Sequence, residues 1–266
     1  MDILARHHVS LSGPDDGKPM VFAHGFGCDQ TMWRHVAPAF ADRYRVITFD
    51  HIGAGGSDLS SYDAQKYADL SGYAADVVEI VRSLDLHNVV FVGHSVSAII
   101  GALAVIEAPD RFSKLVMVAP SPRYIDDGDY IGGFTGEDID ELLESLASNY
   151  LGWSSVMAPV IVGNAERPEL GNELTASFCR MDPDIARQFA TATFLSDNRQ
   201  DLAKVGVPTL VLQCSDDVIA PSTVGAYVAG AVPDGRLVQL AATGHCPNLS
   251  APEETTAAIE DFLRQR

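Results

Sequence analysis

Basic residues are scarce in this sequence. Its 266 residues include 18 Lys and Arg against 36 Asp and Glu, which gives a formal charge of −18 with neutral histidine. Nucleic acids and anionic membranes both bind through clusters of Lys and Arg, so the composition argues against either partner. Long apolar runs are also missing, because no apolar stretch reaches the length of about 18 residues that a membrane-spanning helix requires.

Cysteine is rare and follows no metal-binding pattern. The four cysteines share no C-x-x-C spacing, so we expect reduced thiols rather than disulfides or a zinc site. Residues 1–13 contain no apolar stretch long enough for the core of a signal peptide. Nucleotide-binding loops are absent too, since Gly53–Gly56 does not match G-x-G-x-x-G and no G-x-x-x-x-G-K-[ST] occurs. We therefore expect a cytoplasmic protein that needs neither a metal nor a cofactor.

Apolar residues make up 47% of the chain and charged residues 20%, which suits a globular protein with a sizeable core. Short runs rich in Val, Ile, Leu and Phe alternate with segments of helical periodicity. Such runs predict strands buried on both faces, in a mostly parallel sheet flanked by helices. The predicted strands are Pro19–His24, Arg45–Asp50, Asn88–Gly93, Lys114–Ala119, Pro208–Cys214 and Arg236–Leu240. The predicted helices are Tyr73–Leu84, Ser95–Ala108 and Glu253–Leu263.

This alternation stops between residues 121 and 204, where no good strand occurs. Glu137–Tyr150 places its apolar residues on one helical face, and Asp182 followed by Pro183 is a typical helix start. We therefore predict one domain, with a core formed by 1–120 and 205–266 and an inserted helical lid at 121–204. An insertion at the carboxyl end of a parallel sheet would cover the crevice in which such sheets bind ligands.

The segment Gly93–Ser97 (GHSVS) carries the strongest chemical signal. It follows a predicted buried strand and begins a predicted helix, which is the setting of a nucleophilic serine on a sharp turn. The usual pattern is G-x-S-x-G, and here Ser97 stands in the last position. Because serine is small, the turn remains possible, and we predict that Ser95 is a nucleophile.

A nucleophilic serine needs a base, and that base needs an acid to orient it. Asp217 and His245 follow Ser95 in the expected order, and each comes just after a predicted strand, so all three lie at one sheet edge. Asp216 is the rival acid, but Asp217 has the usual spacing to the next proline. His94 adjoins the nucleophile, yet neighbouring residues of such a turn point apart, so we expect His94 to pack rather than act as the base.

Acyl transfer also needs donors for the developing oxyanion. We expect one from the backbone N–H of Val96, the residue after the nucleophile. The second is expected from Phe26 in the loop His24–Gly27 (HGFG), whose glycines permit tight backbone geometry. Asp50 and His51, at the end of a predicted strand, are interpreted as structural.

Together these motifs resemble the α/β-hydrolase fold from about residue 20 to the C-terminus. His24–Trp33 (HGFGCDQTMW) is similar to the bacterial sigma-B stress regulator RsbQ and its plant relatives, the strigolactone and karrikin receptors. Gly93–Gly101 (GHSVSAIIG) also resembles the plant receptors, whereas Gln213–Pro221 (QCSDDVIAP) and Gly244–Ser250 (GHCPNLS) are more similar to RsbQ.

The resemblance implies a four-helix lid over a small, closed, mostly apolar pocket. Met157 and Ile219 differ from the plant receptors, which have an aromatic and a polar residue there, and this difference argues against a strigolactone-type ligand. Carried over residue by residue, the resemblance assigns the pocket lining to Phe26, Phe134, Trp153, Met157, Phe194 and Ile219.

The predicted function is hydrolysis of a small hydrophobic ester, lactone or enol-ether-type substrate, with Ser95 as nucleophile, His245 as base and Asp217 as orienting acid. The resemblance to RsbQ favours a signalling role and implies a regulatory partner, a PAS-containing phosphatase. Two alternatives stay open: a metabolic carboxylesterase or lactonase without a signalling partner, and a ligand sensor with little turnover.

Overall fold

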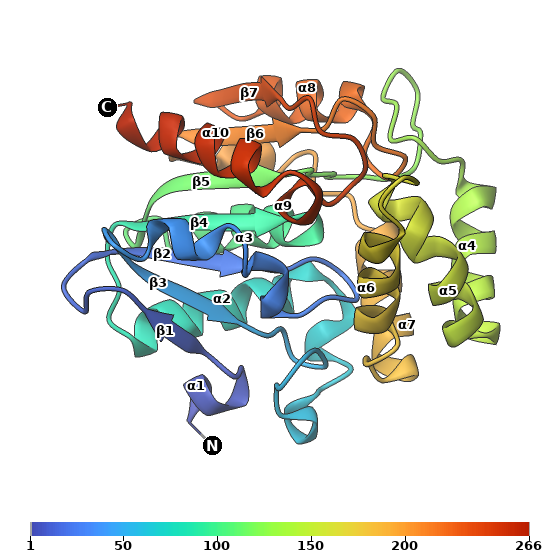
Figure 1. The fold of residues 1–266 in the computed structure, drawn as a ribbon, viewed down its shortest axis with the longest axis horizontal. Coiled ribbons are helices and arrows are strands. Elements are labelled where there is room, and N and C mark those ends of the chain that lie inside the picture. Colours follow the sequence, from blue (N-terminus) through green and yellow to red (C-terminus); the bar gives the residue numbers. More distant parts are fainter. Residues whose placement is uncertain (1, 266) are drawn as a thin grey trace.

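A computed structural model describes residues 2–265, so the two ends of the predicted core, residues 1 and 266, lie outside it. Its centre is a sheet with the strand order β1-β3-β2-β4-β5-β6-β7 (Figure 1). Neighbouring strands from β2 to β7 run parallel, whereas β1 pairs antiparallel with β3. The strands are β1 (Ser10–Ser12), β2 (Lys18–Ala23), β3 (Tyr44–Phe49), β4 (Val89–His94), β5 (Phe112–Val118), β6 (Thr209–Gln213) and β7 (Gly235–Gln239).

The mostly parallel sheet confirms the predicted fold class, but its two edge strands differ from expectation. β1 was not predicted, because its sequence Ser-Leu-Ser is exposed throughout and carries no apolar run. The run Arg236–Leu240 was expected to be buried on both faces, and this was wrong. It forms the edge strand β7, where Leu237 is 37% exposed. The inner strand β4, by contrast, is buried at every residue.

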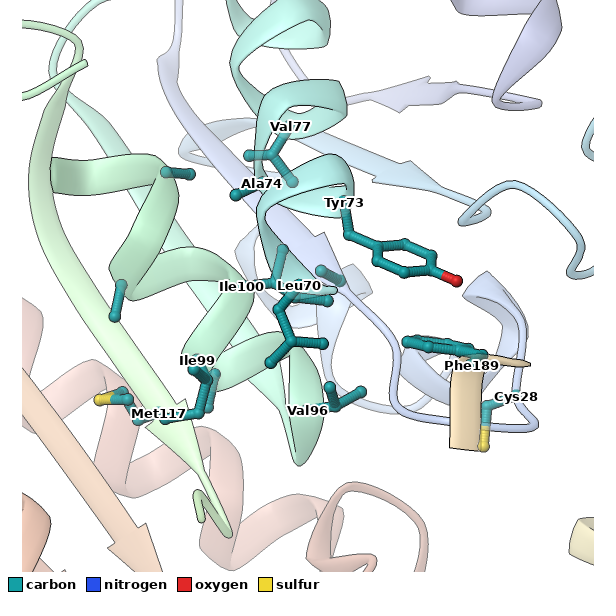
Figure 2. Packing of buried hydrophobic residues seen from close by; sticks show 14 of the residues in the cluster. Cys28, Leu70, Tyr73, Ala74, Val77, Val96, Ile99, Ile100, Met117 and Phe189 are labelled. Carbon is teal, nitrogen blue, oxygen red and sulfur yellow. The ribbon is translucent and has the colours of Figure 1, made fainter. Parts of the chain in front are cut away.

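Helices cover both faces of the sheet. One face packs against α2 (Leu70–Ser83), α3 (Val96–Glu107) and α8 (Ser222–Ala231). Figure 2 shows apolar side chains of α2 and α3 meeting between the two helices, and the ring of Tyr73 lying beside Phe189. The other face packs against α10 (Pro252–Arg264) and the short helices η1 (Gln30–Trp33) and η2 (Ala37–Phe40).

The predicted helices Tyr73–Leu84, Ser95–Ala108 and Glu253–Leu263 correspond to α2, α3 and α10. Several short helices connect the main elements and gave no signal in the sequence, since one turn is too short for a periodic pattern. They are α1 (Ile3–Arg6), η3 (Leu59–Ser61), η4 (Lys66–Ala68), η5 (Leu202–Lys204) and α9 (Pro247–Ser250).

Besides η5, residues 121–204 contain four α-helices that lie beyond one end of the sheet (Figure 1). Thr135 and Asp138 form a capping box at the start of α4, and Asp182 caps α7 by accepting from two backbone N–H groups. The predicted helix Glu137–Tyr150 ends early, because the side chain of Asn149 caps the next helix. The four are α4 (Gly136–Ser148), α5 (Tyr150–Val162), α6 (Pro168–Phe178) and α7 (Pro183–Phe194). We call this segment the helical insertion.

Across residues 2–265, every helix is too short or too polar to cross a bilayer. The cysteines Cys28, Cys179, Cys214 and Cys246 are all unpaired. The same residues contain no cluster of three or more His, Cys, Asp or Glu side chains that could hold a metal ion.

The difference between inner and edge strands leads to a stability prediction. Leu115 of β5 is fully buried and Leu237 of β7 is 37% exposed. Leu115→Ala should lower the free energy of unfolding by about 2–5 kcal/mol because it leaves a cavity, whereas Leu237→Ala should cost less than about 1 kcal/mol. Urea denaturation of the two matched variants measures both values. Equal losses in the free energy of unfolding for Leu115→Ala and Leu237→Ala would contradict the edge position of β7.

Candidate active site

Ser95 occupies a sharp turn between the inner strand β4 and helix α3. Its backbone has φ +56° and ψ −123°, a conformation that non-glycine residues rarely adopt and that stores strain. The turn is tight, since a Cβ atom added at Gly93 would lie 2.2 Å from the carbonyl oxygen of Ser97. The Ser95 N–H donates to the carbonyl of Val118 at 2.8 Å, which anchors the turn to β5.

The structure brings Ser95, His245 and Asp217 together from three different loops. His245 Nε2 lies 2.7 Å from Ser95 Oγ, and His245 Nδ1 lies 2.8 Å from Asp217 Oδ2. All three residues are buried. A serine hydroxyl, an imidazole and a carboxylate joined in this order can activate the hydroxyl as a nucleophile.

The environment of Asp217 keeps its carboxylate ionised. Burial alone would raise the pKa of Asp217, but the neighbouring His245 and hydrogen bonds to the carboxylate outweigh burial, so the pKa lies below its ordinary value. Asp217 Oδ1 accepts from the N–H groups of Ile219 and Ala220 at 2.9 and 3.1 Å. The rival acid Asp216 is exposed, and its backbone carbonyl accepts from Gly244 N–H at 2.7 Å instead.

His94 lies beside the base rather than replacing it. Its ring centroid is 5.2 Å from that of His245, and its Nε2 is 2.7 Å from the His245 carbonyl oxygen. Burial, together with the nearby His245, lowers the pKa of His94 to about 3. His94 is therefore neutral, with its Nε2–H donating to that carbonyl, which leaves this nitrogen unable to accept the Ser95 proton.

The loop that contains Phe26 lies directly against the Ser95 turn. A Cβ atom added at Gly25 would sit 3.2 Å from the Cβ of Ser95. The loop reverses direction because Cys28 N–H donates to the Gly25 carbonyl at 3.3 Å and Gly27 has φ +72°. Within residues 2–265 the N–H groups of Phe26 and Val96 make no hydrogen bond, so both are available to an oxyanion.

A small cavity lies against Ser95 and His245. The space open to the centre of a water molecule is about 30 Å³, room for roughly two waters. Of the side chains predicted to line the pocket, four line this cavity: Phe26, Trp153, Phe194 and Ile219. The wall also contains residues that the sequence did not suggest: Cys28, Tyr124, Ile161, Leu174, Phe178, Thr193 and Cys246.

Phe134 and Met157 do not line this cavity, so the predicted lining needs correction. Both border a separate outer hollow between α4 and α5. Trp153 borders the hollow and the cavity alike, and its ring stacks on Phe178 at 5.7 Å. Trp153 is therefore the residue that the walls of the outer hollow and of the cavity share.

Among the wall residues that were not predicted from the sequence, Tyr124 has the closest link to the chemistry. Burial raises the pKa of its hydroxyl, and an interaction with the Ser95 side chain partly opposes that rise. Tyr124 follows β5 in the segment Ser121–Tyr124 (SPRY), which contains no pattern that assigns a role. Burial likewise raises the pKa of the Cys28 and Cys246 thiols, so both remain uncharged.

Comparison with known proteins gives consistent results. Residues 20–259 match the model of the alpha/beta hydrolase family. The chain is 40% identical to the karrikin insensitive 2 receptor CA of Petunia hybrida over 93% of its length and 92% of the relative. It is 38% identical to the strigolactone esterase D14 of Arabidopsis thaliana, covering 99% and 97% of the two chains. A solved hydrolase from Oleispira antarctica superimposes with a TM-score of 0.96 at 40% identity, over 100% of this chain and 97% of that one.

The position of Asp217 leads to a test of the acid. Asp217→Asn should lower kcat by about 10³–10⁴-fold, because an amide cannot hold His245 in the required tautomer or stabilise its charged form. Asp216→Asn, the adjacent and exposed control, should leave kcat nearly unchanged. Steady-state hydrolysis of an activated ester measures both, and a larger loss in Asp216→Asn would reassign the acid.

The buried histidines make stability depend on pH. Burial lowers the pKa of His24, His51 and His94 below the ordinary value of 6.5. Below pH 6.5 the unfolded chain therefore binds protons that the folded chain does not. Each such histidine should lower the free energy of unfolding by up to about 1.4 kcal/mol per pH unit as the pH falls.

Urea denaturation between pH 6.5 and about 5, above the range in which carboxylates titrate, measures this slope. His94→Gln, a neutral replacement that can still donate a hydrogen bond, should make the slope shallower. A slope that does not change in His94→Gln would show that His94 is protonated in the folded state.

Proposed function

Because the chain belongs to the alpha/beta hydrolase family, we propose that Ser95, His245 and Asp217 hydrolyse a small, largely apolar ester, lactone or enol-ether-type substrate. The observation that carries this proposal is the unbroken chain of contacts from Ser95 Oγ through His245 to Asp217, at 2.7 and 2.8 Å, beside a small apolar cavity. The two backbone N–H groups next to Ser95 complete the requirements of acyl transfer.

In the proposed first half-reaction, Ser95 Oγ attacks the acyl carbon while its proton passes to His245 Nε2. Asp217, ionised and held by two backbone N–H groups, stabilises the imidazolium that forms. The N–H groups of Phe26 and Val96 stabilise the negative oxygen of the tetrahedral intermediate. His245 then gives the proton to the leaving oxygen, and the bond between that oxygen and the acyl carbon breaks.

In the second half-reaction, water replaces the leaving group. His245 takes a proton from the water, whose oxygen attacks the acyl carbon bound to Ser95. Collapse of the second intermediate breaks the bond to Ser95 Oγ, and His245 returns the proton to that oxygen. The acid product and the free serine result, so the cycle needs only water as co-reactant.

The cavity supports a small substrate. Its wall is almost entirely apolar. Four aromatic rings of the helical insertion surround Phe26: Trp153, Phe178, Phe189 and Phe194 have centroids 5.7–6.3 Å from its ring. Packed rings resist displacement because each contacts several others. We therefore place short acyl groups and small lactones ahead of long-chain lipids as substrates.

We further propose a signalling role, in which turnover or occupancy of the cavity alters the helical insertion and a partner protein detects the change. The relatives named receptors support this role. So do Leu151, Val156 and Val160, apolar side chains of α5 that are 49–66% exposed. As in the RsbQ-like scheme, the partner would be a PAS-containing phosphatase in the cytoplasm, and the unpaired cysteines fit that compartment. A metabolic carboxylesterase or lactonase is the alternative.

Hydrolysis of p-nitrophenyl acetate and its longer-chain homologues tests the proposal. We expect turnover to be highest with the acetate and to fall with chain length, because the cavity is small. Ser95→Ala should lower kcat by about 10³-fold or more, since it removes the nucleophile. Hydrolysis that persists in Ser95→Ala would exclude the proposed mechanism.

The time course separates the two roles. A burst of p-nitrophenol followed by near-arrest would support the signalling role, because the acyl-enzyme would then persist long enough for a partner to detect it. Rapid multiple turnover, without binding of a purified PAS-containing phosphatase, would favour the metabolic alternative.

A further inference from the structure

Behind the Ser95 turn lies a buried polar cluster that the proposed reaction does not use. It consists of His24, His51 and Ser97, each at most 1% exposed. Ser97 stands where the usual G-x-S-x-G pattern has glycine, and His24 begins the loop that contains Phe26. The cluster therefore joins the two segments that supply the oxyanion donors.

The available donors and acceptors determine the direction of each hydrogen bond in this cluster. Ser97 Oγ donates its single proton to the His24 carbonyl oxygen, an acceptor only. His51 Nε2 lies 2.7 Å from the same Ser97 Oγ and must therefore donate to it. His51 Nδ1 is then without a proton, and it has no hydrogen-bond partner within residues 2–265.

The side chain of His24 is oriented in the same way. The backbone N–H of His51 donates to His24 Nε2 at 3.1 Å, so this nitrogen carries no proton. The proton of the neutral ring must then be on Nδ1, which donates to the Gly25 carbonyl oxygen at 2.9 Å. Burial lowers the pKa of both His24 and His51, in agreement with two neutral rings.

These bonds determine where the Phe26 N–H points. The Gly25 carbonyl and the Phe26 N–H belong to one planar trans peptide unit, in which C=O and N–H point in opposite directions. Two donors hold that carbonyl on one side, His24 Nδ1–H at 2.9 Å and Cys28 N–H at 3.3 Å. The Phe26 N–H is therefore directed away from them. Ser97 holds the preceding peptide unit by its His24 carbonyl.

We propose that Ser97 and His51 are positioning residues that lock the Phe26 loop to the Ser95 turn, so that the Phe26 and Val96 N–H groups converge on one oxyanion. Ser97 belongs to the first turn of α3, the helix that presents the Val96 N–H, and it bonds the loop that presents the Phe26 N–H. This inference rests on the proposed ester hydrolysis for its catalytic consequence, but the lock itself is a structural feature that can be tested separately.

The kinetic test uses Ser97→Ala, which removes the hydroxyl and leaves the His24 carbonyl without its donor. We expect kcat for p-nitrophenyl acetate to fall by about tenfold to a hundredfold, less than when an oxyanion donor is deleted, while KM changes by less than about twofold. The inhibition constant of a small trifluoromethyl ketone, which forms a tetrahedral adduct with a serine, should rise by a similar factor as kcat falls. Equal losses in kcat and in substrate affinity, or an unchanged kcat, would overturn the proposal.

Matched variants separate positioning from stability. Ser154→Ala removes a hydroxyl that is also fully buried and also donates to a carbonyl, that of Tyr150 at 2.7 Å, but lies in α5. Ser154→Ala should lower the melting temperature about as much as Ser97→Ala does, but it should leave kcat unchanged. His51→Gln, whose amide can still donate to Ser97, should retain more activity than His51→Phe. If Ser154→Ala loses as much activity as Ser97→Ala, the effect is one of stability and the proposal fails.

Nuclear magnetic resonance tests the lock without any turnover. The Phe26 amide resonance should shift in Ser97→Ala and stay in place in Ser154→Ala, and the imidazole resonances should report His51 protonated on Nε2 and His24 on Nδ1. An unmoved Phe26 amide would overturn the lock whatever the kinetics. If the wild type hydrolyses no ester but the Phe26 amide shifts as expected, the proposed function fails and the lock stands.

Discussion

The strained backbone of Ser95 is the constraint on which the rest of the site depends. A positive φ at a non-glycine residue persists only where the surroundings hold it in place. Here the inner strand β4 enters the turn, α3 leaves it, and the Ser95 N–H is bonded to β5. The same geometry exposes the Ser95 hydroxyl to His245 and leaves the Val96 N–H without an internal partner. The stable sheet thus holds the strained turn in place and compensates for its cost.

Elements whose burial imposes a local pattern of apolar residues could be predicted from the sequence. Runs such as Asn88–Gly93 predicted the inner strands because residues buried on both faces must all be apolar. The edge strands could not be predicted in the same way. β1 has no apolar run, and β7 has one even though it is partly exposed. Burial of a run depends on its place in the sheet, which the run itself does not encode.

For the candidate site, the order of the motifs along the chain was informative, whereas the sequence did not give the distances between side chains in space. Ser95, Asp217 and His245 could be proposed because each follows a strand, and parallel strands end at one edge. The cavity wall was harder, since it depends on how four helices pack. The resemblance assigned Phe134 and Met157 to the pocket together with Phe194, but Phe194 lines the cavity beside Ser95 whereas the other two border the outer hollow. The roles of His24, His51 and Ser97 depend on bonds between residues far apart, which no local motif predicts.

Helix α5 is in direct contact with the loop that contains His245. His245 N–H donates to the Ile161 carbonyl at 2.9 Å, and a Cβ atom at Gly244 would lie 1.9 Å from the Val162 carbonyl oxygen. A displacement of α5 would therefore also move the backbone of His245. The cavity wall and the histidine loop are in this way mechanically coupled, so that the position of one constrains the position of the other.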